Sequence, residues 1–353
     1  MHSQQTPYTT KALEFLKKIG ETNKKQPRIS RHNFFTALSN LNLFILLTQT
    51  VNLCDRRYHP TEKWQFLQQF LHYYSSFIFV LKSTDTGKQY MIRNNFNIDT
   101  SLIEEWAQAL LFLFEDSMTK KAFQCCTEKR MQSLFPELAI PVRLILNRLF
   151  DRDTRLFGYD FGCGLNFDLP LLASDYLPYG YRLPKNSIKK FNYPVNIDKA
   201  IGIDLQEPDI EWARVCSSPV IERDIPTYIR LRDSYPNRFV FQKGDILDFL
   251  PENPADFVIT KRMRYQFLKK DQRKIKKSIF KSLRNGGYWI TVGEEDYFKK
   301  QYSHYLWSEN SEVWIYQKSG RGLIKIGNKP AIEYSQKNRQ ITDFDIDFFN
   351  TDR

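Results

Sequence analysis

The sequence has no apolar run that approaches the roughly 18 residues of a membrane-spanning helix. Its longest apolar stretches cover only residues 41–47 and 109–114. The first residues contain no apolar segment followed by a small-residue cleavage site, so we expect no secretory signal. The chain has only five cysteines in 353 residues, and none are spaced as C-x-x-C. These absences predict a cytoplasmic protein without membrane spans, a disulfide framework or a cysteine zinc site.

Histidine is also scarce, because the chain has only five, and none pair at metal-ligand spacing. We therefore expect no metal. His72 lies within an apolar helical segment, and we interpret it as a packed histidine. Neither a P-loop nor a G-x-S-x-G elbow is present, which removes the usual motifs of nucleotide hydrolysis and of serine hydrolases.

Acidic residues are nearly absent from one short segment. The net charge is +12, and residues 261–284 contain eleven basic residues and one acidic residue. Such a segment can steer a polyanion, but it is also typical of a solvated helix face. Lys261, Arg262 and Arg264 precede the helical part and follow an expected strand.

The first 150 residues have helical patterns, over 61–82, 101–118 and 141–150, with Ser101 and Glu104 at capping-box spacing. From Leu156 onward, short apolar runs alternate with helix-length segments, which indicates a parallel sheet with crossover helices. Residues 313–318 and 322–327 predict a closing antiparallel hairpin. We therefore predict an all-α domain over 1–150 and an α/β domain over 151–353.

One connection in the α/β domain is unusually long. Residues 175–199 are rich in tyrosine, proline and asparagine, and form either an inserted loop or part of a lid. Tyr176, Tyr179 and Tyr181 within it are either packed aromatic residues or stacking surfaces for single-stranded nucleic acid.

Four short motifs follow one another at the ends of the first four expected strands. They are DFGCGLN (160–166), IGID (201–204), GDI (244–246) and ADFVIT (255–260). Glycines after the first strand allow a ligand to approach the backbone closely, and an acidic residue ending the second strand can accept both hydroxyls of a ribose.

This succession resembles the class I S-adenosylmethionine-dependent methyltransferases over about residues 155–330. The resemblance implies a Rossmann-like domain that binds S-adenosylmethionine. Asp160, Gly162 and Gly164 would line the methionine end, Asp204 would bind the ribose, and Asp245 with Ile246 would bind the adenine. Asn166, where the family usually has a third glycine, and Thr260 complete the expected cofactor-binding residues. A dinucleotide fold is disfavoured because its fingerprint needs glycine at Phe167.

Two partial resemblances concern the acceptor. GCGLN behind a helical domain is similar to the ribosomal RNA methyltransferases of aminoglycoside resistance. The stretch ITKRMRYQFLKKDQRKI…LRNGGYWITVGEE is similar to the chemotaxis-receptor glutamate methyltransferases. After the fourth strand no NPPY-type tetrad occurs, which disfavours transfer to the exocyclic amine of a DNA base.

The candidate acceptor-side residues are Arg262, Tyr265 and Glu294, none of them fixed by a specific motif. The basic excess favours RNA or another polyanion as the acceptor. A small-molecule or protein-carboxylate methyltransferase is favoured by the long insertion and the helical domain. A non-catalytic binding module on a degenerate methyltransferase fold is the third hypothesis, because of Asn166.

Overall fold

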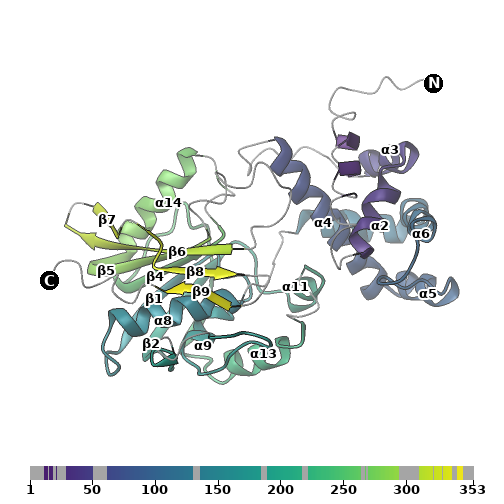
Figure 1. Cartoon of the computed structure of the whole chain (residues 1–353). Coiled ribbons are helices and arrows are strands. Elements are labelled where there is room, and N and C mark those ends of the chain that lie inside the picture. The colour runs from purple at the N-terminus through teal and green to yellow at the C-terminus, as the bar shows by residue number, and fades with distance from the viewer. Residues whose placement is uncertain are drawn as a thin grey trace. The chain divides into compact units, whose positions relative to one another are not determined.

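The computed structural model describes residues 12–14, 16–18, 21, 29–50, 62–129, 136–183, 189–216, 222–263, 267, 269–293, 310–320, 322–327, 329–335 and 340–344. The chain divides into two compact units, residues 1–131 and 132–353 (Figure 1).

The first unit is helical, as predicted. Its helices are α2 (Ile29–Leu38), α3 (Leu41–Thr50), α4 (Glu62–Ser83), α5 (Asp85–Arg93), α6 (Ile103–Glu115) and α7 (Ser117–Glu128). An aromatic core joins α2, α4 and α6, because the fully buried Trp106 of α6 lies 5.2–6.1 Å, between ring centroids, from Phe34, Tyr74, Phe77 and Phe96. Aromatic pairs at this spacing add to the free energy gained by burying the rings.

His72 belongs to this helical unit, and its Nε2 donates to the Cys126 carbonyl at 3.1 Å. Desolvation of the ring lowers the pKa of His72 to about 4, and the hydrogen bond opposes that shift. The interpretation of His72 as a packed histidine is therefore confirmed.

The start of α6 differs from the prediction. Leu102 is the N-cap residue, and its backbone N–H donates to the Glu105 carboxylate at 2.6 Å. The Ser101 hydroxyl instead accepts the backbone N–H of Asn97 at 2.9 Å. Because the serine is engaged in the preceding turn, the capping pair is shifted by one residue from Ser101 and Glu104.

The second unit is built on one mixed sheet. Its strands are β1 (Leu156–Phe161), β2 (Ile197–Asp204), β3 (Phe239–Lys243), β4 (Ala255–Lys261), β5 (Leu283–Val292), β6 (Asn310–Ser319), β7 (Gly322–Ile326), β8 (Ile332–Ser335) and β9 (Gln340–Phe344). The order across the sheet is β3-β2-β1-β4-β5-β6-β8-β9, and β7 pairs with β6. Strands β1 to β5 pair in parallel, whereas the remaining pairs are antiparallel. The predicted α/β fold and closing hairpin are thus confirmed, and β8 and β9 extend the sheet beyond what we predicted.

Helices cover both faces of the sheet (Figure 1). They are α8 (Ala139–Leu149), α9 (Asp168–Leu172), α11 (Ile210–Cys216), α13 (Ile225–Asp233) and α14 (Lys269–Ser282), with a short 3₁₀ turn at Pro136–Leu138. The α8 face is the one where α8, α9 and α13 pack, and the α14 face is the opposite one. A parallel sheet needs this double cover because its strands are apolar on both sides.

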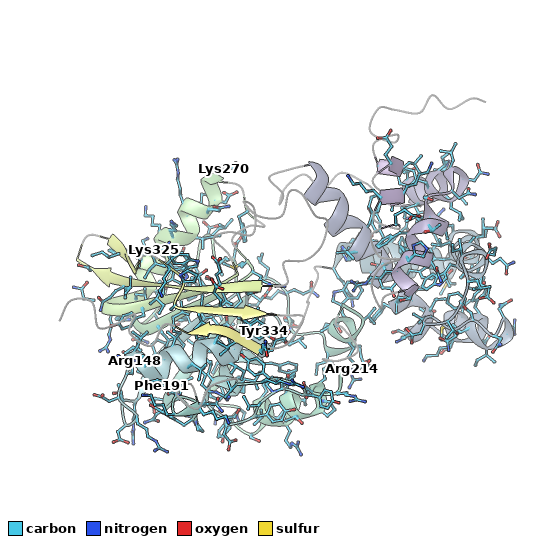
Figure 2. All side chains as sticks on the ribbon, in the orientation of Figure 1. Arg148, Phe191, Arg214, Lys270, Lys325 and Tyr334 are labelled. Atoms are coloured by element: carbon cyan, nitrogen blue, oxygen red, sulfur yellow. The ribbon has the colours of Figure 1, made fainter. Side chains whose placement is uncertain are left out.

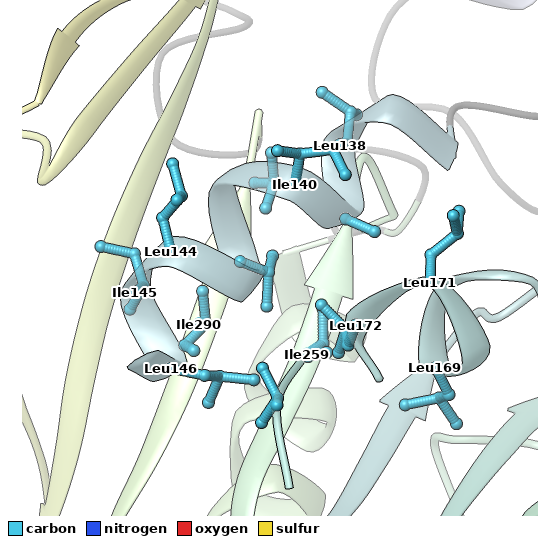
Figure 3. Packing of buried hydrophobic residues seen from close by; sticks show 14 of the residues in the cluster. Leu138, Ile140, Leu144, Ile145, Leu146, Leu169, Leu171, Leu172, Ile259 and Ile290 are labelled. Carbon is cyan, nitrogen blue, oxygen red and sulfur yellow. The ribbon is translucent and has the colours of Figure 1, made fainter. Parts of the chain in front are cut away.

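Helix α8 belongs to the sheet and not to the helical unit, which corrects the predicted boundary at residue 150. Leu146 of α8 packs in one cluster with Ile259 of β4 and Ile290 of β5 (Figure 3). Every residue of α8 from Ala139 to Asn147 is buried. A helix that is buried on all sides needs a partner surface, and the sheet supplies it, so the division falls between residues 131 and 132.

Arg143 of α8 holds the long connection after α9. Its guanidinium is fully buried and donates to the carbonyls of Leu171, Ser174 and Tyr176 and, at 2.5 Å, to the Asn192 side chain. Burial lowers the pKa of Arg143 to about 10, so the group stays charged at neutral pH. One cation therefore donates to several carbonyls in and after the last turn of α9, which ties the connection to α8.

The tyrosines of this connection are largely packed. The Tyr176 hydroxyl donates to the buried Asp224 carboxylate at 2.6 Å, and the Tyr181 ring stacks on Tyr334 at 5.5 Å. Tyr179 is 56% exposed, with the Arg223 guanidinium 4.7 Å from its ring centroid. Of the two interpretations of these residues, packing applies to Tyr176 and Tyr181.

Replacing Arg143 with Met should lower the free energy of unfolding by about 3 kcal/mol, because buried carbonyls lose a charged donor. Urea unfolding of the full chain measures the loss. Arg230→Met, at an exposed position whose guanidinium donates to Thr227, is the matched control. Equal effects of the two substitutions would contradict a clamping role for Arg143.

Candidate functional site

The strand order reverses between β1 and β4. From β1 the chain continues through β2 to β3 on one side, and it returns on the other side through β4 to β5. In open α/β sheets, ligands bind at the carboxyl ends of the strands at such a switch point. Asp160, Asp204 and Lys261 lie at these ends.

Alternation along the strands decides which side chains share a face. In β1, Tyr159 and Phe161 pack on the α14 face, so Asp160 between them lies on the α8 face. In β4, Ile259 packs on the α8 face, and Lys261 two residues later lies on that same side. Asp160 and Lys261 are therefore neighbours on adjacent strands.

The Thr260 side chain lies on the opposite face, and its contact with a cofactor stays a prediction. Its hydroxyl is fully buried and accepts a hydrogen bond from Trp289 Nε1 at 3.0 Å. Trp289 belongs to the cluster that α14 covers. The Thr260 side chain therefore supports the α14 face of the sheet and does not face Asp160.

The turn after β1 is fastened to the end of β2. The backbone N–H of Gly162 donates to the Ile203 carbonyl at 2.8 Å, and that of Gly164 donates to Asp204 Oδ2 at 2.9 Å. Both glycines have positive φ, +74° and +56°. A Cβ at Gly164 would have no described atom within 4 Å, so the turn leaves room there for a ligand.

Asn166 also has a positive φ, +56°. Asparagine tolerates this conformation better than most residues, so Asn166 can occupy a turn position whose backbone conformation favours glycine. Its side chain is buried against β2, where a Cβ at Gly202 would come within 2.3 Å of Asn166 Oδ1. The Asn166 side chain is thus directed towards β2 and β3, and it packs between the turn and these strands.

Asp160 is fully buried, and neither carboxylate oxygen has a hydrogen bond with any residue that the structure describes. Burial raises the pKa of Asp160 to about 6; Lys261 opposes this shift and Asp204 adds to it. Buried carboxylates normally accept hydrogen bonds, so this group is suited to a donor or cation brought by a ligand.

Lys261 is nearly buried, and its ammonium forms an ion pair with Asp168 at the start of α9. Burial lowers the pKa of Lys261, and Asp160, Cys163 and Glu137 oppose that shift. The Lys261 side chain thus enters the site and is not part of the exposed surface of the basic segment 261–284. Asp168 was not predicted at all.

Cys163 lies inside the turn and is 5% exposed. Burial, with Asp160 and Asp204 nearby, raises the pKa of its thiol well above the ordinary value. The thiol therefore stays protonated at neutral pH, as expected for a small residue chosen for fit and not for nucleophilic chemistry.

The ends of β2 and β3 lie side by side, because the Gly244 N–H donates to the Asp204 carbonyl at 2.9 Å. Asp204 Oδ1 also accepts the Gln206 N–H at 3.3 Å, and Asp245 Oδ1 accepts the Leu247 N–H at 2.9 Å. Ile246 is buried on the α14 face. The structure thus brings Asp160, Asp204 and Asp245 to one edge of the sheet.

Arg262 does not reach the surface, and its role as an acceptor contact stays a prediction. It is 4% exposed, with φ +49°, and its guanidinium donates to Ser311 of β6 at 3.1 Å. The left-handed backbone turns the side chain inward after β4. Tyr265, Glu294 and Arg264 lie outside the described residues.

Within the described ranges, no three His, Cys, Asp or Glu side chains are arranged to hold a metal ion. No helix in the same ranges has both the length and the apolarity of a membrane span.

No family model and no curated protein matches the sequence. Several solved structures match remotely. The N-methyltransferase NodS of Bradyrhizobium japonicum, solved with S-adenosyl-L-homocysteine, is 16% identical with a TM-score of 0.29, over 46% of this chain and 66% of its own. YcgJ of Bacillus subtilis is 13% identical with a TM-score of 0.27, over 44% of this chain and 50% of its own. An S-adenosylmethionine-dependent methyltransferase of Mesorhizobium loti is 13% identical with a TM-score of 0.24, over 42% of this chain and 51% of its own. The match to NodS spans less than two thirds of that protein. Because these TM-scores are low, we assign the fold from the strand order and connections described above and not from the matches.

Asp160→Asn should stabilise the free protein at pH 8. A raised carboxyl pKa means that the folded state binds the proton more tightly, so this group costs stability above pH 6. The amide removes that cost, on the order of 1–3 kcal/mol, and the difference from wild type should vanish as the pH falls towards 4. Thermal unfolding across this range measures it; destabilisation at pH 8 would contradict an unsatisfied carboxylate.

Proposed function

We propose that this protein is an S-adenosylmethionine-dependent methyltransferase whose acceptor is RNA or another polyanion. The observation that carries the proposal is the Asp160 carboxylate, buried without a hydrogen-bond partner among the described residues at the switch point. The methionine end of the cofactor has an ammonium group that would satisfy this carboxylate.

The neighbouring groups suit the rest of such a ligand. Gly164 leaves space above the turn, and Asp204 is half-buried, with carboxylate lone pairs beyond those used by Gly164 and Gln206. Ribose hydroxyls are donors of the kind that such a carboxylate accepts. Asp245 lies one strand further along, on the side expected for the adenine.

A dinucleotide cofactor suits this turn less well. Its third glycine would fall at Phe167, whose ring is 2% exposed and packs against Tyr228 at 5.6 Å. A large side chain there leaves no close approach for a pyrophosphate between the strand and the helix.

When bound, S-adenosylmethionine supplies a methyl group that its sulfonium already activates. The protein's task is to align the acceptor with that methyl group and to exclude water. Asp160, Asp204 and the glycine turn would hold the cofactor in one orientation on rigid strand ends. No described residue is assigned as a base.

The acceptor side of the proposal rests on helix α14. Its outer surface carries six exposed cations, Lys270, Arg273, Lys274, Lys276, Lys277 and Lys281. Asp271 is the acidic residue in the helix, and Lys325 of β7 lies on the same side of the sheet (Figure 2). Such a surface attracts phosphates, and the N-terminal end of α14 follows β4 at the edge that holds the site.

S-adenosylmethionine should raise the melting temperature of the wild-type protein, because a ligand at about 100 times its Kd stabilises by roughly 2.7 kcal/mol. NADH is the control.

Asp204→Asn keeps an oxygen for the Gly164 N–H but removes the charge, so affinity for S-adenosylmethionine should fall about tenfold or more. The exposed Asp233→Asn should leave affinity unchanged. A shift with NADH alone would refute the proposal, and unchanged affinity in Asp204→Asn would remove Asp204 from it.

Two double variants, each reversing the charge of two lysines four residues apart on α14, test the acceptor surface. Lys270 and Lys274 lie near the sheet edge that holds the site, whereas Lys277 and Lys281 lie about 10 Å further along the helix. We expect K270E/K274E to reduce methylation of cellular RNA strongly. In binding to random-sequence single-stranded RNA, the slope of the logarithm of the association constant against the logarithm of the salt concentration should become less steep by about 1.4. K277E/K281E should have a smaller effect on methylation.

The outcomes separate the acceptor classes. Equal losses for both pairs would indicate a broad surface that grips a long nucleic acid. No loss for either pair, with cofactor binding intact, would contradict the polyanion and favour a small-molecule or protein-carboxylate acceptor. Cofactor binding without methylation of any fraction of a cell extract would favour the non-catalytic module.

A further inference from the structure

Two charged groups at the switch point are close to each other but do not form a salt bridge. Asp160 and Lys261 lie on the same face of adjacent strands, and each affects the pKa of the other. Neither Asp160 oxygen has a hydrogen bond from a described residue. The Lys261 ammonium pairs with Asp168 instead.

Asp168 competes effectively for the lysine because it is equally secluded from water. The side chains of Lys261 and Asp168 are 10% and 8% exposed, so solvent screens their attraction little. Asp168 begins α9, whose neighbouring residues Leu169, Leu171 and Leu172 are fully buried in the α8-face core (Figure 3). The position of the carboxylate is therefore fixed by packing, whereas the lysine is a flexible chain of four methylene groups.

Without Asp168, the lysine would have a different partner within reach. A buried ammonium that loses its carboxylate is strongly destabilised and will turn to another anion. Asp160 is suited to receive it, because it is buried, adjacent and lacks a hydrogen bond within the described residues. An Asp160–Lys261 salt bridge would occupy the carboxylate that we assign to the ligand.

We propose that Asp168 is a positioning residue that holds the Lys261 ammonium away from Asp160, and so keeps the Asp160 carboxylate open for the cationic end of the ligand. This inference rests on the proposed function. It adds a role for two residues that do not themselves need to touch the cofactor.

The first test needs no ligand. In Asp168→Asn the freed lysine pairs with Asp160, so the pKa of the Asp160 carboxyl should fall by about one unit or more. Carbon-13 NMR of the labelled carboxyls, assigned by comparison with Asp160→Asn, measures it. An unchanged or raised pKa of Asp160 would overturn the inference, whatever the protein binds.

The second test is binding of S-adenosylhomocysteine by calorimetry. Asp168→Asn should bind about tenfold or more weakly, equivalent to 1.4 kcal/mol. The double variant D168N/K261M, which removes the whole ion pair, should bind within about threefold of wild type, because replacing both partners of a buried pair is often nearly neutral.

Each further outcome has one meaning. Wild-type affinity in Asp168→Asn, or no recovery in D168N/K261M, would overturn the inference, since Asp168 would then matter only for folding or by direct contact. Failure of the wild-type protein to bind S-adenosylhomocysteine would refute the proposed function. The carboxyl titration would still test whether Asp168 holds Lys261 away from Asp160. If Asp168→Asn does not fold, Asp168→Ser with and without Lys261→Met makes the same comparison.

Discussion

The Asp160 carboxylate is fully buried at the end of β1, and a buried anion is stable only where opposite charge or hydrogen-bond donors lie close to it. Lys261 supplies part of that compensation from the adjacent strand, but its ammonium is paired with Asp168. Asp204 adds a further negative charge at the end of β2. Among these four groups three carboxylates face one ammonium, and this edge of the sheet therefore favours a ligand that brings a positive charge.

The surrounding elements keep this arrangement rigid. Hydrogen bonds from Gly162 and Gly164 fasten the turn to β2, and the small Gly202 leaves room for Asn166 beneath it. Arg143 holds the long connection that follows α9. The α8 face is thus fixed by buried polar contacts as well as by apolar packing, so Asp160 has little freedom to find another partner.

The sequence allowed the parallel part of the second unit to be predicted, because each of the strands β1 to β4 is a short, largely apolar run with a polar residue at or next to its carboxyl end. The direction of the side chains in β4 was not predictable. Ala255–Lys261 is buried on both faces, so its residues show no alternation that would set Thr260 and Lys261 on opposite sides.

Long-range contacts and backbone geometry account for the other features that the sequence did not predict. Nothing local to Lys261 indicates that Asp168, far earlier in the chain, will pair with it. Arg262 turns inward because its φ is positive, an unusual conformation for arginine that its neighbours do not signal. The mostly apolar sequence of Ala139–Leu149 was a signal that α8 belongs to the sheet, and we assigned it by proximity to the other helices.

The central claim is that the buried Asp160 carboxylate receives the cationic end of S-adenosylmethionine at the β1–β4 switch point. A crystal structure of the full chain with S-adenosylhomocysteine tests it most directly. The account predicts the amino group of the ligand within hydrogen-bond distance of Asp160, its ribose at Asp204, and Lys261 still paired with Asp168. A ligand bound elsewhere, or one that leaves Asp160 without a contact, would contradict it.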